Sequence, residues 1–150
     1  MIAEQITLPP ELLVSRIIAL LEHCDAVPLT ITGSSMSPFL IHGRDTVYLS
    51  KPHRPLRKGD MIFYRRDNGR YILHRIYRVD SDRYWLVGDA QTGIEPGIRS
   101  DQVIALVTAV RRKDKLLKPG SLCWDFFEKI WLYMIPLRPY MVKVYSIFHK

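Results

Sequence analysis

One stretch reads Thr32-Gly33-Ser34-Ser35-Met36-Ser37-Pro38-Phe39-Leu40 and places a serine hydroxyl between a glycine and a proline. Gly33 lets the backbone turn sharply and approach a ligand closely, because glycine has no Cβ. Pro38 fixes its own φ angle and stiffens the exit from the turn. The stretch therefore predicts either an ordinary loop or a turn that presents Ser35 as a nucleophile. The elements around it decide between the two.

Short runs rich in β-branched and aromatic residues surround this stretch and predict antiparallel strands. These runs are 27–32, 45–50, 61–66, 71–79, 83–87 and 103–111. Asp67-Asn68-Gly69-Arg70 separates two of them, and Asn-Gly between β-rich segments is a strong hairpin signal. The predicted fold class is therefore mainly β.

Helices are predicted at both ends. Pro9-Pro10-Glu11 suits a helix start, and apolar residues then recur at helical spacing. The predicted packing face consists of Leu12, Leu13, Ile17, Leu20, Leu21 and Cys24. Ser121 suits a second helix cap, and Pro136 and Pro139 are expected to divide the aromatic segment after it into two short helices. We expect an N-terminal packing helix (1–26), a β catalytic domain (27–112), and a basic linker with an aromatic helical tail (113–150).

The composition suits a globular protein with an anionic partner. The chain has 150 residues and a formal net charge of +7, a balance that favours nucleic acid or an acidic membrane surface. Cys24 and Cys123 lie far apart, so we expect both to be reduced and buried, and we expect no metal and no cofactor. The apolar runs are too short to span a bilayer, and Met1–Gln5 lacks the pattern of a secretory signal. A cytoplasmic location, with peripheral membrane contact as an option, is therefore expected.

A serine nucleophile needs a base, and the sequence offers five histidines. His74 differs from the others because it lies in the middle of an apolar strand, on the same face as Ile72 and Ile76. Such a residue is either a hydrogen-bonded structural histidine or a base. A histidine base also needs an acceptor for its other ring nitrogen, and Asp89 and Glu95 are the best-placed carboxylates. The remaining histidines are expected at the surface: His23, His42, His53 and His149.

The segment Gly33-Ser34-Ser35-Met36-Ser37-Pro38 resembles the Gly-x-Ser-Met-x-Pro nucleophile box of type I signal peptidases. Further pieces follow in that family's order: Gly43-Arg44-Asp45-Thr46-Val47, Arg57-Lys58-Gly59-Asp60-Met61-Ile62-Phe63, His74-Arg75-Ile76 and Gly88-Asp89. The resemblance covers about residues 27 to 110. It implies a signal peptidase/LexA-like complex β fold with an N-terminal helix and a C-terminal aromatic helical tail.

The resemblance also implies roles for individual residues. His74-Arg75 stands where the usual bacterial enzymes carry Lys-Arg, so the chain resembles the Ser-His type of the endoplasmic reticulum and archaea. Ser35 would be the nucleophile and His74 the general base, with Asp89 or Glu95 completing the relay. The Ser35 N–H would hold the oxyanion with help from Ser34 or Gly33. The residues expected to position the oxyanion or substrate are Gly33, Ser34, Met36 and Pro38. A departure from the family is also expected: none of the apolar runs in these 150 residues is long enough to be the usual N-terminal membrane anchor.

The predicted function is a serine endopeptidase that cleaves a peptide or the leader of a precursor protein, with an activity pKa of roughly 6 to 7 for a histidine base. One alternative is a LexA-type self-cleaving protein, although no Ala-Gly or Cys-Gly pair is present. Another is a non-catalytic basic β module that binds nucleic acid or an anionic membrane. Nucleic acid is the weaker partner, because no RNA-binding signature accompanies the basic residues. Residues 111–150 would either close the core as a lid or make peripheral contact with an anionic membrane.

Overall fold

The computed structural model describes residues 9–148, apart from the side chain of Pro96. His149 and the segment Met1–Gln5 lie outside the described residues. The strands are β1 Val27–Thr30, β2 Thr46–Ser50, β3 Met61–Arg65, β4 Tyr71–Asp80, β5 Arg83–Val87, β6 Glu95–Arg99, β7 Val103–Arg112 and β8 Lys115–Leu117. The helical segments are α1 Pro10–Leu21, η1 Ser100–Gln102, α2 Leu122–Asp125, η2 Phe126–Ile130, η3 Trp131–Leu137 and α3 Arg138–Phe148.

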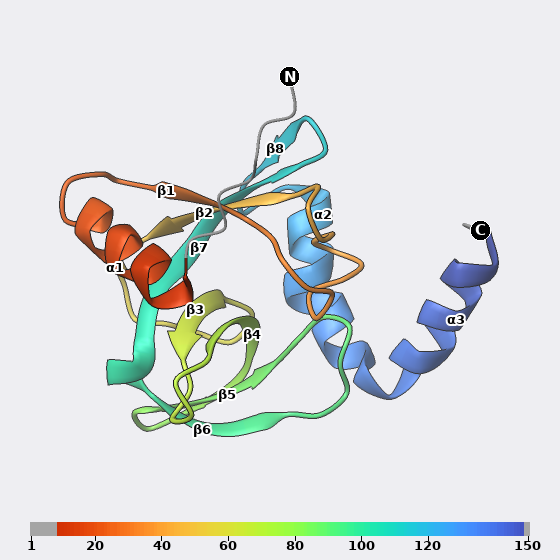
Figure 1. Cartoon of the computed structure of the whole chain (residues 1–150). Coiled ribbons are helices and arrows are strands. Elements are labelled where there is room, and N and C mark those ends of the chain that lie inside the picture. Colours follow the sequence, from red (N-terminus) through yellow and green to blue (C-terminus); the bar gives the residue numbers. More distant parts are fainter. Residues whose placement is uncertain (1–8, 149–150) are drawn as a thin grey trace.

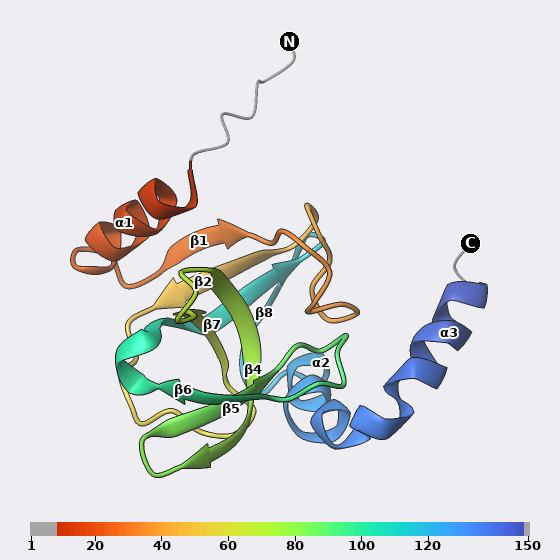
Figure 2. The ribbon, with the colours of Figure 1, turned by 60° about the horizontal axis from the view of Figure 1, so that its bottom comes forward.

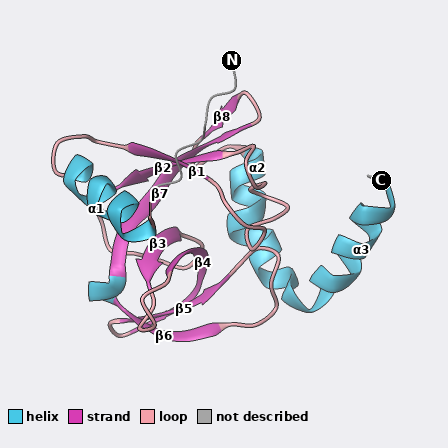
Figure 3. Cartoon of the chain, viewed as in Figure 1, coloured by secondary structure: helices cyan, strands magenta, loops and turns pink. Residues whose placement is uncertain are grey.

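The fold is mainly β, as the sequence predicts. The strands form one curled antiparallel sheet in the order β1-β2-β7-β3-β4-β5-β6, and β8 pairs with β7 (Figures 1 and 3). The Asn-Gly turn joins β3 to β4 as a hairpin in which Ile62 lies opposite His74 and Tyr64 lies opposite Ile72. Residues two apart on a strand share a face, so this register places Tyr64 diagonally beside His74.

Two apolar cores lie on the two faces of the curled sheet, and β3 is buried on both sides. The larger core packs α1 and the start of the tail against the sheet and includes Ile17, Phe39, Leu49, Trp124 and Trp131. Figure 2 shows how β3 to β6 curl round. The smaller core is built from β3, β4, β5, β6 and β7 and consists of Ile62, Tyr64, Ile76, Leu86, Ile98 and Leu106. His74 faces this smaller core, because it lies on the same face of β4 as Ile72 and Ile76. Leu73 lies on the opposite face and packs against the larger core.

The N-terminal helix differs from the prediction in its end and in its packing face. It ends at Leu21 and buries Val14, Ile17 and Leu21, whereas Leu12, Leu13 and Leu20 are exposed. Cys24 was expected to be buried, but it lies beyond the end of the helix and is exposed. Cys123 is half-buried.

The tail also differs from the prediction. The segment 113–120 was expected to be a linker, but it contains β8, which pairs with β7. Pro136 lies inside η3, where the backbone leaves helical geometry at Met134, and Pro139 lies in the first turn of α3, where proline is tolerated. None of the helices in residues 9–148 combines the length and the apolar character needed to cross a bilayer.

Candidate active site

The turn that carries Ser35 is held from both ends. Three of its side chains, Met36, Phe39 and Leu40, are buried in the larger core. The Leu40 N–H donates to the Met36 carbonyl at 2.9 Å, and the Gly33 N–H donates to His42 Nδ1 at 2.8 Å. Gly33 has a φ of +82°, which other residues adopt only at a cost. The apolar anchors and the glycine together hold Ser35 in a half-buried position.

The Ser35 turn is joined directly to the loop between β5 and β6. The Ala90 N–H donates to the Ser35 carbonyl at 2.9 Å. A Cβ on Gly88 would lie 2.5 Å from the same carbonyl oxygen, so a side chain at position 88 would collide with the backbone of Ser35. The loop that carries Asp89 therefore packs against the Ser35 carbonyl and supports the backbone of the predicted nucleophile.

Two backbone donors lie at Ser35 itself. Within residues 9–148, neither the Ser34 N–H nor the Ser35 N–H has a hydrogen-bond partner, and the Ser35 hydroxyl has none either. The Gly33 N–H is engaged by His42, so its expected contribution to an oxyanion site is not available in this arrangement. Two neighbouring unpaired amides are the kind of donor pair that stabilises an oxyanion.

His74 is almost fully buried, with 3% of its surface exposed, and its Nδ1 faces a polar network. The Tyr64 hydroxyl lies 3.3 Å from His74 Nδ1 and donates to Glu95 Oε2 at 2.7 Å. Since the hydroxyl proton points to Glu95, the Tyr64 oxygen is free to accept from Nδ1–H. The Glu95 carboxylate lies 3.9 Å from Nδ1 and is held by two hydrogen bonds from Arg66, at 2.6 and 2.9 Å.

The other ring nitrogen of His74 is left open. Nε2 makes no hydrogen bond within the described part of the chain. In the described residues, the side-chain nitrogen and oxygen atoms that are both fully buried and without a hydrogen-bond partner are Arg112 Nε and Arg138 Nε. His74 Nε2 also lacks a partner but is not among these buried atoms. It therefore retains contact with solvent. An imidazole with a protonated Nδ1 and an accessible Nε2 lone pair has the tautomer that a general base needs.

The electrostatics of the network keep His74 neutral. Burial lowers the pKa of His74 to about 4, although the Glu95 carboxylate pulls in the opposite direction. Burial also works to raise the pKa of Glu95, but hydrogen bonds from Arg66 and Tyr64 outweigh it and lower that pKa. Burial and the bond to Glu95 raise the pKa of the Tyr64 hydroxyl above its usual range. The network therefore consists of a neutral imidazole, a neutral phenol and an ionised carboxylate at neutral pH.

Asp89 does not take part in this network. Its carboxylate is fully buried and accepts two hydrogen bonds of 2.9 Å from Arg75, whose third bond, also 2.9 Å, goes to the Gly59 carbonyl. Arg75 follows His74 in β4 and so lies on the opposite face of the strand. Of the two carboxylates that the sequence offered for orienting His74, Glu95 is the one within reach.

Sequence reasoning missed the part that four residues play around the site. The position of Tyr64 and Arg66 beside His74 and Glu95 depends on the strand register that the Asp67–Arg70 hairpin sets, so it could not be predicted from local patterns. Arg138 comes from the tail: its guanidinium is buried and donates to the carbonyls of Gly88, Gln91 and Trp131 at 2.9, 2.8 and 3.0 Å. The indole of Trp131 donates to the Asp89 carbonyl at 2.8 Å. The tail thus completes the loop beneath Ser35.

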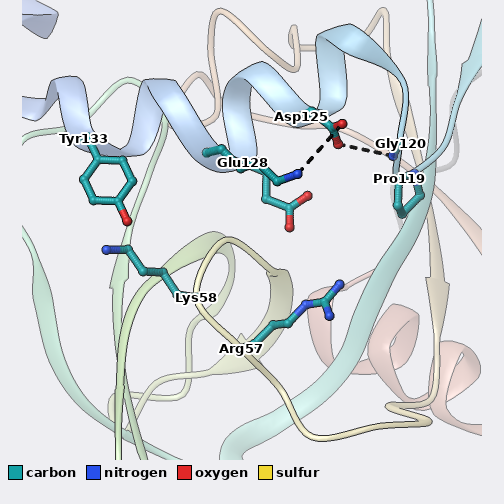
Figure 4. Close-up of a pocket in the computed structure, with 8 residues that line it drawn as sticks. Arg57, Lys58, Pro119, Gly120, Asp125, Glu128 and Tyr133 are labelled. Carbon is teal, nitrogen blue, oxygen red and sulfur yellow. Dashed lines mark hydrogen bonds and ion pairs between the residues drawn. The ribbon is translucent and has the colours of Figure 1, made fainter.

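A separate pocket lies between the loop before β3 and the helices of the tail (Figure 4). Lys58 Nζ lies 4.1 Å from the centre of the Tyr133 ring, and Asp125 accepts from the Gly120 N–H. None of the predicted site residues lines this pocket. Across residues 9–148, no group of three or more His, Cys, Asp or Glu side chains could hold a metal ion.

Comparison with known proteins gives one match. Residues 2–107 match the family model described as Peptidase S24-like, and this range contains Ser35, His74, Asp89 and Glu95. No curated protein and no solved structure matches the chain. The family lies in the superfamily of LexA and the signal peptidases, which agrees with the predicted fold. Because the match spans more than half of the sequence, the chain belongs to the Peptidase S24-like family.

Proposed function

We propose that this protein is a serine endopeptidase in which Ser35 is the nucleophile, His74 is the general base and Glu95 orients His74 through the Tyr64 hydroxyl. The observation that carries the proposal is the buried His74, whose Nδ1 faces Tyr64 and Glu95 while its Nε2 stays unpaired. Membership of the Peptidase S24-like family supports the peptidase class. The assignment to the Ser-His type rests on the residues of this chain.

In the proposed reaction, Ser35 Oγ attacks the carbonyl carbon of the scissile peptide bond as its proton passes to His74 Nε2. The carbonyl oxygen becomes an oxyanion that accepts from the N–H groups of Ser34 and Ser35. The imidazolium returns its proton to the leaving amine, which releases one product and leaves an acyl ester on Ser35. A water molecule then attacks the ester carbonyl and gives its proton to His74, which passes that proton to Ser35 Oγ as the acid product leaves.

The charge of the network suits this role. The imidazolium formed in each step would be stabilised by Glu95 at 3.9 Å, with the Tyr64 oxygen accepting from Nδ1–H. Because burial lowers the pKa of His74 to about 4, the base is already unprotonated at mildly acidic pH. The sequence predicts an activity pKa of roughly 6 to 7, and burial moves the expected acid limb of the rate profile well below that range.

The proposed substrate is a peptide or precursor segment bound in an extended form. β1 is an edge strand that pairs with β2 alone in the described chain and leads into the Ser35 turn. An extended peptide that added to this edge would be guided towards Ser35 by main-chain hydrogen bonds. The resemblance to signal peptidases implies small residues before the scissile bond.

Cleavage of a mixed peptide library, read out by mass spectrometry, tests the proposal. The wild-type protein should cut a restricted set of bonds, and Ser35→Ala should cut none of them. Ser37→Ala is the matched control, because Ser37 lies in the same turn and its hydroxyl has no partner within residues 9–148. Cuts that persist in Ser35→Ala, or that vanish equally in Ser37→Ala, would count against Ser35 as the nucleophile.

Self-cleavage is a second candidate that the family match favours, since the superfamily includes LexA-type proteins. The same serine and histidine would then act on a segment of their own chain. Incubation of the purified protein alone, followed by intact-mass measurement, separates the two functions. A single concentration-independent cut that Ser35→Ala abolishes would support self-cleavage.

A further inference from the structure

The last helix, α3, carries an apolar face that belongs to neither of the two apolar cores. The helix stands away from the sheet in both views (Figures 1 and 2). Its inner side begins with Pro139 and Val142, which line a pocket with the loop residues 90–93. Helical spacing places five apolar side chains on the opposite side, each between 36% and 78% exposed. This outer face of α3 consists of Tyr140, Met141, Val144, Ile147 and Phe148.

The charge around the outer face has one sign. From Lys129 to the last residue the sequence contains no Asp and no Glu. Arg138 is buried and Lys129 lies 4.0 Å from Asp125, so Lys143 is the exposed basic residue of α3. Helical spacing places Lys143 at the border of the outer face, where its long side chain can extend the ammonium group towards lipid headgroups. An amphipathic helix with this composition is suited to the headgroup region of an anionic bilayer.

A second copy of the chain is the other occupant to consider, and the outer face is small for it. α3 has 11 residues and is about 16 Å long. One face of so short a helix offers on the order of a few hundred Å², whereas a stable protein interface buries about 800 Å² on each partner. α3 also contains no Asp or Glu, so a second copy of the helix would offer Lys143 no oppositely charged partner.

We propose that α3 is an interfacial helix whose outer face enters the headgroup region of an anionic membrane. The apolar side chains supply the insertion, and Lys143, in a segment without Asp or Glu, supplies attraction to the anionic lipids. The bilayer is thereby contacted by a part of the chain that lies outside the 2–107 range of the family match.

The base of α3 is tied to the Ser35 site. The buried Arg138 guanidinium donates to the Gly88 and Gln91 carbonyls, and within the same loop the Ala90 N–H donates to the Ser35 carbonyl. A membrane-bound α3 would therefore hold Ser35 near the lipid surface. This second step rests on the proposed peptidase function and implies a substrate that is itself membrane-bound or membrane-adsorbed.

Vesicle sedimentation tests the membrane proposal without any need for activity. Full-length Ser35→Ala protein is mixed with vesicles of phosphatidylcholine alone, or with about one third phosphatidylglycerol. It should sediment with the anionic vesicles, and high salt should weaken the binding. Val144→Asp/Ile147→Asp in the same background should weaken binding more than about tenfold, because both apolar groups leave the inserted face.

The matched control places the same charges elsewhere. Leu116 and Leu122 are 48% and 91% exposed and lie outside α3, so Leu116→Asp/Leu122→Asp should bind vesicles like its parent. Equal loss in both double variants would overturn the assignment to α3, as would a parent that ignores anionic vesicles. If the parent is a dimer without lipid and Val144→Asp/Ile147→Asp makes it a monomer, the outer face belongs to a second copy instead. Lys143→Glu, which leaves the apolar face intact, should also weaken anionic binding; unchanged binding would contradict the charge argument.

The peptidase step has its own readout. With the wild-type protein, a cleavable peptide tethered to anionic vesicles should be cut faster than the same peptide free in solution. Val144→Asp/Ile147→Asp should remove this difference and leave cleavage of the free peptide unchanged. Vesicle binding without any cleavage would reject the peptidase function while leaving the membrane proposal standing.

Discussion

At the scale of single residues, His74 is neutral because two opposing effects are unequal. The nearby Glu95 carboxylate favours the imidazolium, but the loss of water around a residue that is 3% exposed disfavours it more strongly. The result is an imidazole that is already unprotonated at neutral pH. The same burial gives the folded state a cost that appears when the pH falls.

The pH dependence of stability follows from this pKa. The unfolded chain binds a proton on His74 near pH 6.5, whereas the folded chain binds it at about 4. The folded state is therefore fully stable with respect to this group above pH 6.5 and loses up to about 3 kcal/mol as the pH falls to about 4. Urea unfolding of the wild type and of His74→Gln across this range isolates the effect. Parallel curves for the two proteins would contradict the lowered pKa.

Tyr64→Phe removes one oxygen from the centre of the network. The ring and its packing in the smaller core stay, and Arg66 still holds Glu95, but His74 Nδ1 loses its neighbouring acceptor. We expect kcat to fall by about tenfold or more, as it does when partners that orient a histidine are lost, with little change in KM. The pH profile should shift as well, because Glu95 loses its bonded link to the imidazole. A wild-type profile in Tyr64→Phe would show that the hydroxyl serves only packing.

The sequence could identify Ser35 and His74 as candidates, because a Gly-x-Ser-Met-x-Pro box and a histidine among isoleucines are local patterns. It could not choose between Asp89 and Glu95. That choice depends on Arg75, which donates two hydrogen bonds to Asp89 on the opposite face of the strand. It also depends on the Tyr64 hydroxyl, which lies between His74 and Glu95. Both are contacts between strands and leave no local trace in the sequence.

At the scale of elements, the contact between the Ser35 turn and the loop after β5 is the one most sensitive to change. Gly88→Ala would place a Cβ 2.5 Å from the Ser35 carbonyl oxygen and must push the turn away. We expect a loss of about 1 to 3 kcal/mol in stability and about a hundredfold in activity. Thermal unfolding and peptide cleavage measure both effects.

Gly93→Ala is the control for this prediction. Gly93 lies in the same loop, and a Cβ there would meet nothing within 4 Å. The variant should differ from the wild type by less than about 0.5 kcal/mol. Equal damage from both alanines would mean that the loop as a whole, rather than its contact with Ser35, is sensitive to substitution.

The strands with clear alternation and a strong turn signal were predictable, and their bounds agree with the structure to within two residues. The structure adds β6 and β8, which the sequence hides. β6 contains Pro96 and Gly97, both weak in strands, and it forms because β5 provides a partner. β8 has three residues, one lysine and two leucines, and is too short for a strand pattern to be recognised in the sequence; it pairs with β7. In α1 the predicted packing face includes Leu13 and Leu20, whereas the helix buries Val14 instead. Helical spacing alone does not determine which of two neighbouring apolar rows packs against the sheet.

At the scale of the whole molecule, the tail is both part of the core and a projection from it. Trp124, Phe127 and Trp131 pack into the larger core, whereas α3 leaves it. The aromatic residues are visible in the sequence, but this division is not. The tail leaves the core at Arg138, and the burial of that residue cannot be predicted from the sequence. A basic residue next to Pro139 reads as exposed, yet three main-chain carbonyls surround its guanidinium.

Arg138→Met tests how far the tail supports the site. The methionine fills part of the space, but the carbonyls of Gly88, Gln91 and Trp131 lose their buried donor. We expect a loss of about 2 kcal/mol or more in the free energy of unfolding, together with reduced activity. Arg111→Met is the control, because Arg111 is exposed and donates to the Tyr48 hydroxyl. An Arg138→Met protein as stable and active as Arg111→Met would show that the tail is independent of the site.

The central claim is that Ser35 is a nucleophile activated by His74, and covalent labelling with a fluorophosphonate measures it without a known substrate. The serine oxygen attacks phosphorus, fluoride leaves, and the hydroxyl proton passes to the base. Peptide mapping of the wild type should find one adduct, on Ser35, that is absent from Ser35→Ala and unchanged in Ser37→Ala. Labelling of His74→Gln should be slower by about a hundredfold. An adduct on another residue, no adduct, or equally fast labelling of Ser35 without His74 would contradict the claim.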